Sequence, residues 1–282
     1  MKRNDFAALL RPRIGVMAAA GAGAGWLMAT SGTGPGLLPA LAAGFLLSCG
    51  ASALNQAQEA AQDARMERTR NRPVASGRLG APTAALLGLC CAGLAAALLF
   101  TSPGGLAAAL LVPLTLLVYN GLYTPLKKRT SLAMLVGGLA GALPPVLGFA
   151  ASGANPLDAR ALLLAGVFYA WQVPHFWLFA RIHRTDYEAA GFRVPHNGVA
   201  EGRAAGTLGI WLVSYGASML LLPAFGLVDA PVIKWLMAAL ALGLVACPKF
   251  IHARERLGLV LVNASLALFL AFLAVDALRL TA

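Results

Sequence analysis

Residues 55–77 read NQAQEAAQDARMERTRNRPVASG, a charged stretch set between two long apolar runs. Asn55, Glu59 and Asp63 are four residues apart, so on a helix they lie along one face, one turn from each other. Two carboxylates and an amide oxygen in that arrangement can share a hard cation such as Mg²⁺. The arginines that follow could hold an anionic group beside that cation. The alternative is a solvated loop whose charges only anchor the topology, although topology requires lysine and arginine and not acids.

The composition outside this stretch is that of a membrane protein. The chain has 282 residues, of which 59% are hydrophobic and 12% charged, and its mean hydropathy is +0.73. A soluble domain carries about twice that share of charge. The net charge of +11 would suggest a nucleic-acid partner in a soluble chain, but none is expected here. The four cysteines lie in or beside apolar runs without a CxxC pair, which predicts small buried residues and neither disulfides nor a metal site.

Nine apolar runs are long enough to cross a bilayer, and they predict an all-α polytopic protein forming a single domain over residues 1–282. The runs are 14–30, 36–55, 83–101, 105–123, 132–152, 161–180, 206–226, 230–249 and 258–279. The basic N-terminus superficially resembles a signal peptide, but its basic segment is long and no A-x-A site follows, so we expect a retained first span. Internal prolines at 113, 144–145, 174 and 223 predict bends.

The basic residues fall almost entirely on one side of these spans. Nineteen of the 22 lysines and arginines lie before the first span or in alternate loops, which leaves Arg160, Lys234 and Arg279 on the other side. Eight of the eleven acids share the basic side. The positive-inside rule then predicts a cytoplasmic N-terminus and an external C-terminus.

A coarse repetition predicts two four-helix halves followed by a last helix. Spans one to four and spans five to eight each carry an acidic, arginine-containing loop between their second and third members, and the second loop holds Asp186 and Glu188 in HRTDYEAAG at 183–191. A third, basic cluster reads YTPLKKRT at 123–130, where Lys128 and Arg129 could offset phosphate charge. The alternative is that this cluster serves only to set the orientation of the protein in the membrane. No Walker or Rossmann glycine pattern occurs, so the phosphate-bearing ligand is not expected to be a nucleotide.

Polar residues also fall inside the predicted spans. WQVPHF at 171–176 places Gln172 and His175 in the sixth span, where they need partners and are costly without a function. The imidazole could bind iron or a substrate, or else pair with a carbonyl freed by Pro174. Tyr123 lies at the cytoplasmic end of the fourth span, where an interfacial role is the alternative to substrate binding.

These motifs together resemble a known family. The run from Asp63 to Gly77, YT…LKKRT, GALPPVLGFAA at 141–151, WQVPHF and DYEAAG resemble, in order and spacing, the signatures of the protoheme IX farnesyltransferases (haem O synthases). These enzymes belong to the UbiA-type intramembrane prenyltransferases. The resemblance is close over residues 45–200 and elsewhere rests on the pattern of spans.

The resemblance implies nine helices around a central cavity, in a bacterial cytoplasmic (inner) membrane. It implies transfer of farnesyl from farnesyl diphosphate, held through Mg²⁺, to a vinyl group of haem B by way of an allylic cation. By position, Glu59, Asp63 and Asp186 would be catalytic acids and metal ligands. The substrates would be bound by Asn55, Arg68, Arg72, Tyr123, Lys128, Arg129, Gln172 and His175, the last as a haem ligand. A haem A synthase or a terminal oxidase assembly is the implied kind of protein partner.

Two departures from the family pattern stand out. Glu59 replaces the usual aspartate, and FRVPHNG follows DYEAAG where the family has a Pro-Met-Leu-Pro-like run. A diverged member with another acceptor, such as a quinone-type aromatic or another lipid, is therefore an alternative. A nine-span transporter is an alternative of a different class, although the near absence of acids inside the spans argues against it.

Overall fold

The computed structural model describes residues 3–30, 32–194 and 201–278, and within these ranges every regular element is helical. The elements are α1 (Arg3–Leu10), α2 (Pro12–Thr30), α3 (Leu37–Gln58), α4 (Ala60–Asp63), α5 (Ala81–Phe100), α6 (Gly105–Ala109), α7 (Leu111–Leu116), the π-helix η1 (Leu117–Tyr123), α8 (Thr124–Leu126), α9 (Ala133–Ala151), α10 (Ala159–Ile182), α11 (Arg184–Ala189), α12 (Glu201–Ala224), α13 (Pro231–Ala246), α14 (Pro248–Ala253) and α15 (Glu255–Ala277).

Within the described residues the predicted apolar runs are largely helical, and by the length and composition of its helices the chain is an integral membrane protein. Seven stretches are long and apolar enough to cross a bilayer: Leu37–Gln58, Ala81–Phe100, Gly105–Leu126, Ala133–Ala151, Ala159–Ile182, Gly202–Ala224 and Glu255–Ala277. The glycine-rich α2 is not among them, and α13 has only 16 residues. Many leucines on the outer surface are exposed, as expected for a lipid-facing exterior. The nine-span arrangement in two halves stays a prediction.

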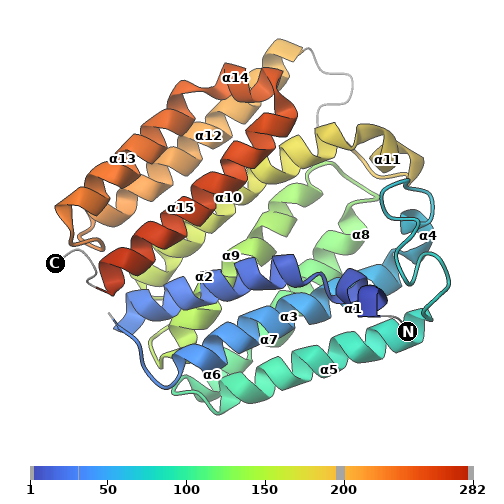
Figure 1. Cartoon of the computed structure of the whole chain (residues 1–282), viewed down its shortest axis with the longest axis horizontal. Coiled ribbons are helices and arrows are strands. Elements are labelled where there is room, and N and C mark those ends of the chain that lie inside the picture. Colours follow the sequence, from blue (N-terminus) through green and yellow to red (C-terminus); the bar gives the residue numbers. More distant parts are fainter. Residues whose placement is uncertain (1–2, 31, 195–200, 279–282) are drawn as a thin grey trace.

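The long helices pack side by side around the interior (Figure 1). Helix α2 contacts α3 and α9, α9 contacts α10, and α15 contacts both α10 and α2, which closes a ring of helices. Helix α5 packs outside α3, and α12 and α13 pack outside α10 and α15. The short elements α1, α4 and α11 lie together at one end of the long helices (Figure 1).

The fourth predicted span is the most irregular of these helices. The predicted run 105–123 is divided into α6, α7 and η1, with Pro113 inside α7, and α8 continues beyond it. The π-helical turn carries LVYNGLY, and such turns occur often at functional sites because they redirect side chains within a helix. The prolines at 144–145, 174 and 223, where bends were predicted, lie inside α9, α10 and α12. These helices continue past them.

Helices α2 and α9 approach each other through glycine. A Cβ atom built on Gly148 would lie 1.7 Å from the carbonyl oxygen of Ala22, and one built on Gly25 would lie 1.9 Å from that of Pro145. Backbones come this close in membrane bundles where small residues leave room. The contact fixes one wall of the interior.

Replacing Gly148 with alanine is therefore expected to destabilise the fold by about 1–3 kcal/mol, because the added methyl group must push two backbones apart. Thermal unfolding of the purified protein in detergent should show a lower midpoint. Gly166→Ala is the matched control, since no atom lies within 4 Å of a Cβ there. Equal midpoints for the two variants would show that α2 and α9 separate at no cost.

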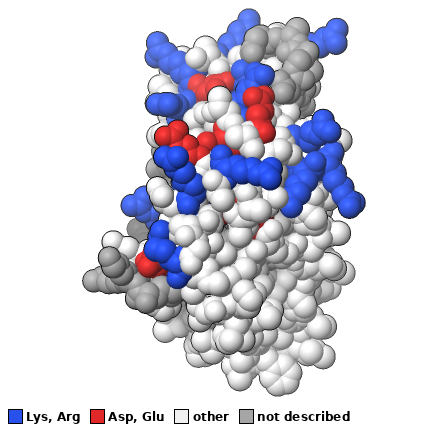
Figure 2. Space-filling view, turned by 90° about the vertical axis from the view of Figure 1, so that its right-hand side faces the viewer, with Lys and Arg blue, Asp and Glu red and all other residues white. Residues whose placement is uncertain are grey.

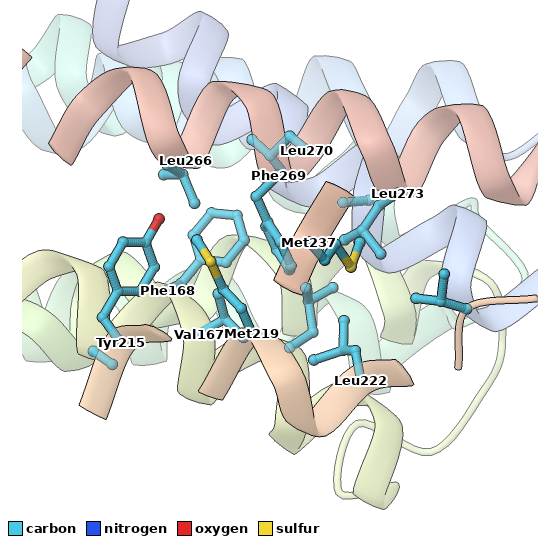
Figure 3. Close-up of a cluster of buried hydrophobic side chains, with 14 of the residues drawn as sticks. Val167, Phe168, Tyr215, Met219, Leu222, Met237, Leu266, Phe269, Leu270 and Leu273 are labelled. Atoms are coloured by element: carbon cyan, nitrogen blue, oxygen red, sulfur yellow. The ribbon is translucent and has the colours of Figure 1, made fainter. Parts of the chain in front are cut away.

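A large apolar core joins the helices of the C-terminal part to α10. Figure 3 shows Val167 and Phe168 of α10 facing Tyr215, Met219 and Leu222 of α12, with Met237 of α13 and Leu266, Phe269, Leu270 and Leu273 of α15 around them. The buried hydroxyl of Tyr215 lies 3.2 Å from that of Ser265, which satisfies both polar groups inside this core. The core holds α10 and α15, and hence the residues they present, in a fixed relation.

The charged residues gather at the end of the molecule that carries α1, α4 and α11. Figure 2 views that side, and lysine and arginine side chains cover much of it among a few acids. The sequence pattern of alternate basic loops predicts this concentration. Two of the 22 lysines and arginines of the sequence, Lys2 and Arg279, lie outside the described residues.

Candidate active site

A cavity of about 490 Å³ lies inside the ring of helices. Its lining comes from α2, α3, η1, α9, α10 and α15, and from the loops at the charged end. Apolar and aromatic residues such as Met17, Leu147, Phe168 and Leu266 line it within the helices, whereas acids and arginines line it beside the loops. The cavity therefore has an apolar part between the helices and a charged part beside the loops.

The predicted helical face is present, and it borders the cavity. Asn55, Glu59 and Asp63 all line the cavity, and each is at most 3% exposed. Helix α3 ends at Gln58, Glu59 lies at the junction, and α4 carries Asp63. Helical backbone hydrogen bonds continue across the junction, from Glu59 N–H to Asn55 and from Asp63 N–H to Glu59. Asn55 Nδ2 donates to Glu59 Oε2 over 3.0 Å. The spacing in sequence thus brings the three side chains together.

Each of the two acids has a basic partner. Lys127 Nζ lies 2.6 Å from Glu59 Oε1 and donates to Oε2 over 2.7 Å. Arg72 Nη1 donates to both oxygens of Asp63, over 3.0 and 2.8 Å. Buried carboxylates are stable only when paired in this way. Burial lowers the pKa of Lys127 below its ordinary value, and the charge of Glu59 opposes that effect.

The basic cluster after α8 contributes a different residue from those predicted. Lys127 reaches the cavity, with its ammonium 4.9 Å from the ring centroid of Tyr123 and 5.3 Å from that of Phe192. Lys128 and Arg129 are exposed and do not line the cavity. Sequence spacing could not separate three consecutive basic residues. The turn that ends α8 points only the first of them inward.

A polar network fixes the π-helix against α3. Asn120 Nδ2 donates to Gln58 Oε1 over 3.0 Å, and Gln58 Nε2 donates to the carbonyl of Asn120 over 3.1 Å. Asn55 Nδ2 also lies 3.1 Å from the hydroxyl of Thr124. The network places Tyr119 and Tyr123 in the cavity wall. For Tyr123, this location fits the substrate-binding hypothesis better than an interfacial one.

Asp186, predicted as a second-site acid, does not line the cavity. Its carboxylate accepts hydrogen bonds from the backbone N–H groups of Glu67 (2.9 Å) and Arg68 (3.4 Å). Within the described ranges, no group of three or more His, Cys, Asp or Glu residues is placed to hold a metal ion, so any cation here would need the amide of Asn55 or substrate oxygens as further ligands. Asp186 thus holds the loop that presents Arg68, whose guanidinium lies 5.1 Å from the centroid of Phe179.

The opposite wall is aromatic and contains His175. The ring of His175 stands between Trp171 and Phe179, with centroids 4.9 and 6.2 Å away. Its Nδ1 lies 2.7 Å from Oδ1 of Asn263 on α15, so its partner is a side chain and not a carbonyl freed by Pro174. Gln172 lines the cavity as well. Because an amide oxygen only accepts, this contact suits the tautomer with the proton on Nδ1, which leaves the lone pair on Nε2.

Two cavity arginines were not predicted as site residues. Arg11 and Arg13, at the junction of α1 and α2, both line the cavity. In the sequence these arginines belong to the basic segment before the first span. Nothing in that segment indicates that they face a cavity. Phe192 also lines it, but residues 195–198 of FRVPHNG lie outside the described residues.

Comparison with known proteins identifies the family. The model of the UbiA prenyltransferase family matches residues 15–273. The chain belongs to that family. It is 42% identical over 247 residues to the protoheme IX farnesyltransferase of Geobacter sulfurreducens, covering 88% of this chain and 90% of the relative. The corresponding protein of Oleidesulfovibrio alaskensis is 39% identical over 270 residues, covering 96% and 95%.

Solved structures of the UbiA prenyltransferase fold agree with the described one. A UbiA homologue from Archaeoglobus fulgidus, bound to DMAPP and Mg²⁺, superposes with a TM-score of 0.71 at 16% identity, covering 97% of this chain and 99% of that one. A digeranylgeranylglyceryl phosphate synthase gives 0.79 at 12% identity, covering 98% of each chain. The family resemblance of the sequence motifs is confirmed, and the protein is a prenyltransferase. The transporter alternative is therefore wrong.

Proposed function

We propose that this prenyltransferase transfers a farnesyl group from farnesyl diphosphate to a vinyl carbon of haem B and so makes haem O. The observation that carries the proposal is the two-part cavity, with paired acids and cations at one end and an aromatic wall with His175 at the other. The relatives from Geobacter sulfurreducens and Oleidesulfovibrio alaskensis bear the name protoheme IX farnesyltransferase, which supports haem as the acceptor over a quinone-type aromatic.

The charged end fits a diphosphate held through one Mg²⁺. Asn55, Glu59 and Asp63 offer oxygen donors, and Mg²⁺ is commonly bound by one or two carboxylates together with substrate phosphates. Mg²⁺ also accompanies the prenyl diphosphate in the Archaeoglobus fulgidus homologue. When bound, Mg²⁺ would offset the charge of the departing diphosphate. Glu59 has one more methylene than aspartate and reaches the same face.

The basic partners have a second task in this proposal. While no diphosphate is present, Lys127 and Arg72 neutralise the carboxylates. With Mg²⁺ held by those oxygens, Lys127 and Arg72 would be free to bind the diphosphate together with Arg68. Preorganised positive charge at a leaving group stabilises the transition state and needs little reorganisation.

The aromatic wall suits the rest of the reaction. Cleavage of the allylic C–O bond leaves diphosphate and a farnesyl cation, a vinyl carbon of haem attacks its C1, and water then adds with loss of a proton. The ring centroid of Tyr123 lies 5.7 Å from that of Phe176, with which it stacks, and 5.4 Å from that of Tyr119. Aromatic rings stabilise a nearby cation through their faces. His175 presents Nε2 as a ligand for the haem iron.

The test is a reaction with purified protein in detergent, farnesyl diphosphate, haem B and Mg²⁺, analysed by mass spectrometry of the extracted pigment. The expected product is haem carrying one hydroxyethylfarnesyl group, and EDTA should abolish it. Farnesylation of a quinone-type aromatic with no change in haem would overturn the assignment of the acceptor.

We also propose that the charged end faces the cytoplasm. A cysteine introduced at exposed Ser76 and one at exposed Thr101, each in a cysteine-free variant, should react with an impermeant reagent from opposite sides of the membrane. Thr101 is preferable to its neighbour Ser102, which is only 8% exposed. Labelling of both from the same side would contradict this topology.

A further inference from the structure

Arg11 and Arg13 have no counter-charge in the cavity. Its basic residues are Arg11, Arg13, Arg68, Arg72 and Lys127. The two acids of the lining, Glu59 and Asp63, are already paired. Among the residues that the structure describes, neither Arg11 nor Arg13 has an ion pair or a side-chain hydrogen bond, in contrast to Arg72 and Lys127.

The reaction proposed above assigns charge to one end of the cavity only. A prenyl diphosphate carries about three negative charges near neutral pH. One Mg²⁺, the two carboxylates, and the cations Arg68, Arg72 and Lys127 together balance a ligand of that charge. Arg11, which is half-buried, and Arg13, which is exposed, are in excess of that balance, so a second anionic group could pair with them. Haem B has two propionate carboxylates, whereas a quinone-type acceptor need have none.

Arg11 follows the last residue of α1 and ends that helix in the left-handed C-cap conformation. Among the described residues, Arg11 is the one non-glycine residue at positive φ, 52°. Such a conformation costs about 1 kcal/mol or more outside glycine, and it persists where the surrounding structure imposes it, often at ligand sites. Its backbone remains bonded, because the N–H donates to the carbonyl of Ala7 over 3.0 Å.

The end of α1 is also held by hydrogen bonds from α3. Gln56, 1% exposed, donates through Nε2 to the carbonyls of Ala8 (2.8 Å) and Leu9 (2.9 Å) at the end of α1. These carbonyls have no partner within a helix that stops at Leu10. The side chain of Leu9 is fully buried against Ala53 of the same helix α3. Gln56 adjoins Asn55, so one helix positions both the metal-facing amide and Arg11.

From these observations we infer that Arg11, with Arg13 beside it at the cavity rim, binds the carboxylates of the acceptor. The inference rests on the proposed function and adds a recognition site that selects a dicarboxylic porphyrin over a neutral aromatic. Arginine suits this task because its planar guanidinium forms paired hydrogen bonds with a carboxylate. Gln56 acts as a positioning residue.

The test compares two porphyrins in the whole purified protein. Haem B and its dimethyl ester, which lacks the carboxylate charges, are titrated by absorbance into wild type, Arg11→Gln, Arg13→Gln and Gln56→Leu. For Arg11→Gln, the dissociation constant for haem B should rise about tenfold or more, because charge-assisted hydrogen bonds are lost. The constant for the ester should not change. Gln56→Leu should also raise the dissociation constant for haem B and leave that for the ester unchanged, although Arg11 itself is intact.

Arg70→Gln is the matched control, since Arg70 is exposed and outside the cavity but carries the same charge. Farnesyl diphosphate affinity with Mg²⁺, measured by calorimetry, should be unchanged in Arg11→Gln. A loss of diphosphate affinity instead, an equal loss for both porphyrins, or no loss for either would each overturn the inference. If wild type binds neither porphyrin, haem is not the acceptor and the proposed function itself fails.

Discussion

Replacing Asp63 with asparagine is expected to lower turnover about 100-fold or more, because a charged metal ligand is lost at the position where the leaving group is held. The change also removes the oxygen pair that holds Arg72 at 3.0 and 2.8 Å. The measurement is the initial rate with saturating farnesyl diphosphate and haem B, over a Mg²⁺ titration, at matched protein concentration.

Glu67→Gln serves as the control for Asp63→Asn, because Glu67 is an exposed acid of the same loop that does not line the cavity. We expect it to keep a rate close to that of wild type. The backbone carbonyl of Asp63 accepts from the hydroxyl of Thr69 in either form, so the local turn should survive the substitution. A near-normal rate in Asp63→Asn would show that Asp63 only pairs with Arg72 and holds no metal ion needed for turnover.

Replacing Lys127 with glutamine should lower the rate by roughly 100- to 1000-fold, since one preorganised positive charge at the diphosphate is removed. Lys128→Gln and Arg129→Gln should each change it by less than about fivefold, because exposed charges contribute little. Each of the three variants loses one positive charge, and the three positions are consecutive. Of these residues, only Lys127 lines the cavity. The measurement is the rate of farnesyl transfer under identical conditions.

The Lys127 variant also leaves Glu59 without its basic partner, which can destabilise the fold. Thermal unfolding with and without Mg²⁺ separates the two effects, because a cation bound to Glu59 should restore stability without restoring the rate. Equal losses of rate in all three variants would show that the cluster acts through its total charge and not through the geometry of Lys127.

The predictions from the sequence were strongest where they depended on local spacing. The i, i+4 pattern of Asn55, Glu59 and Asp63 required only that the chain be helical there, and the three residues do meet at the cavity. Arg72, which the family resemblance implied as a substrate-binding residue, also lines the cavity, where it pairs with Asp63. The departures began where distant segments meet. Asp186 was expected beside a metal, and instead it caps the backbone of the loop around Arg68.

The sequence by itself determined the class and the chemistry. Long apolar runs must satisfy their backbone groups as helices in lipid, and the family motifs identify a prenyltransferase. Tertiary structure alone decided which polar side chains share the cavity. Lys127 lies inward and Lys128 outward because of how the turn after α8 packs, and Asn263 meets His175 because α15 packs against α10. Arg11 enters the cavity because Gln56 clamps α1. Such contacts depend on packing between segments far apart in the chain, which local spacing does not encode.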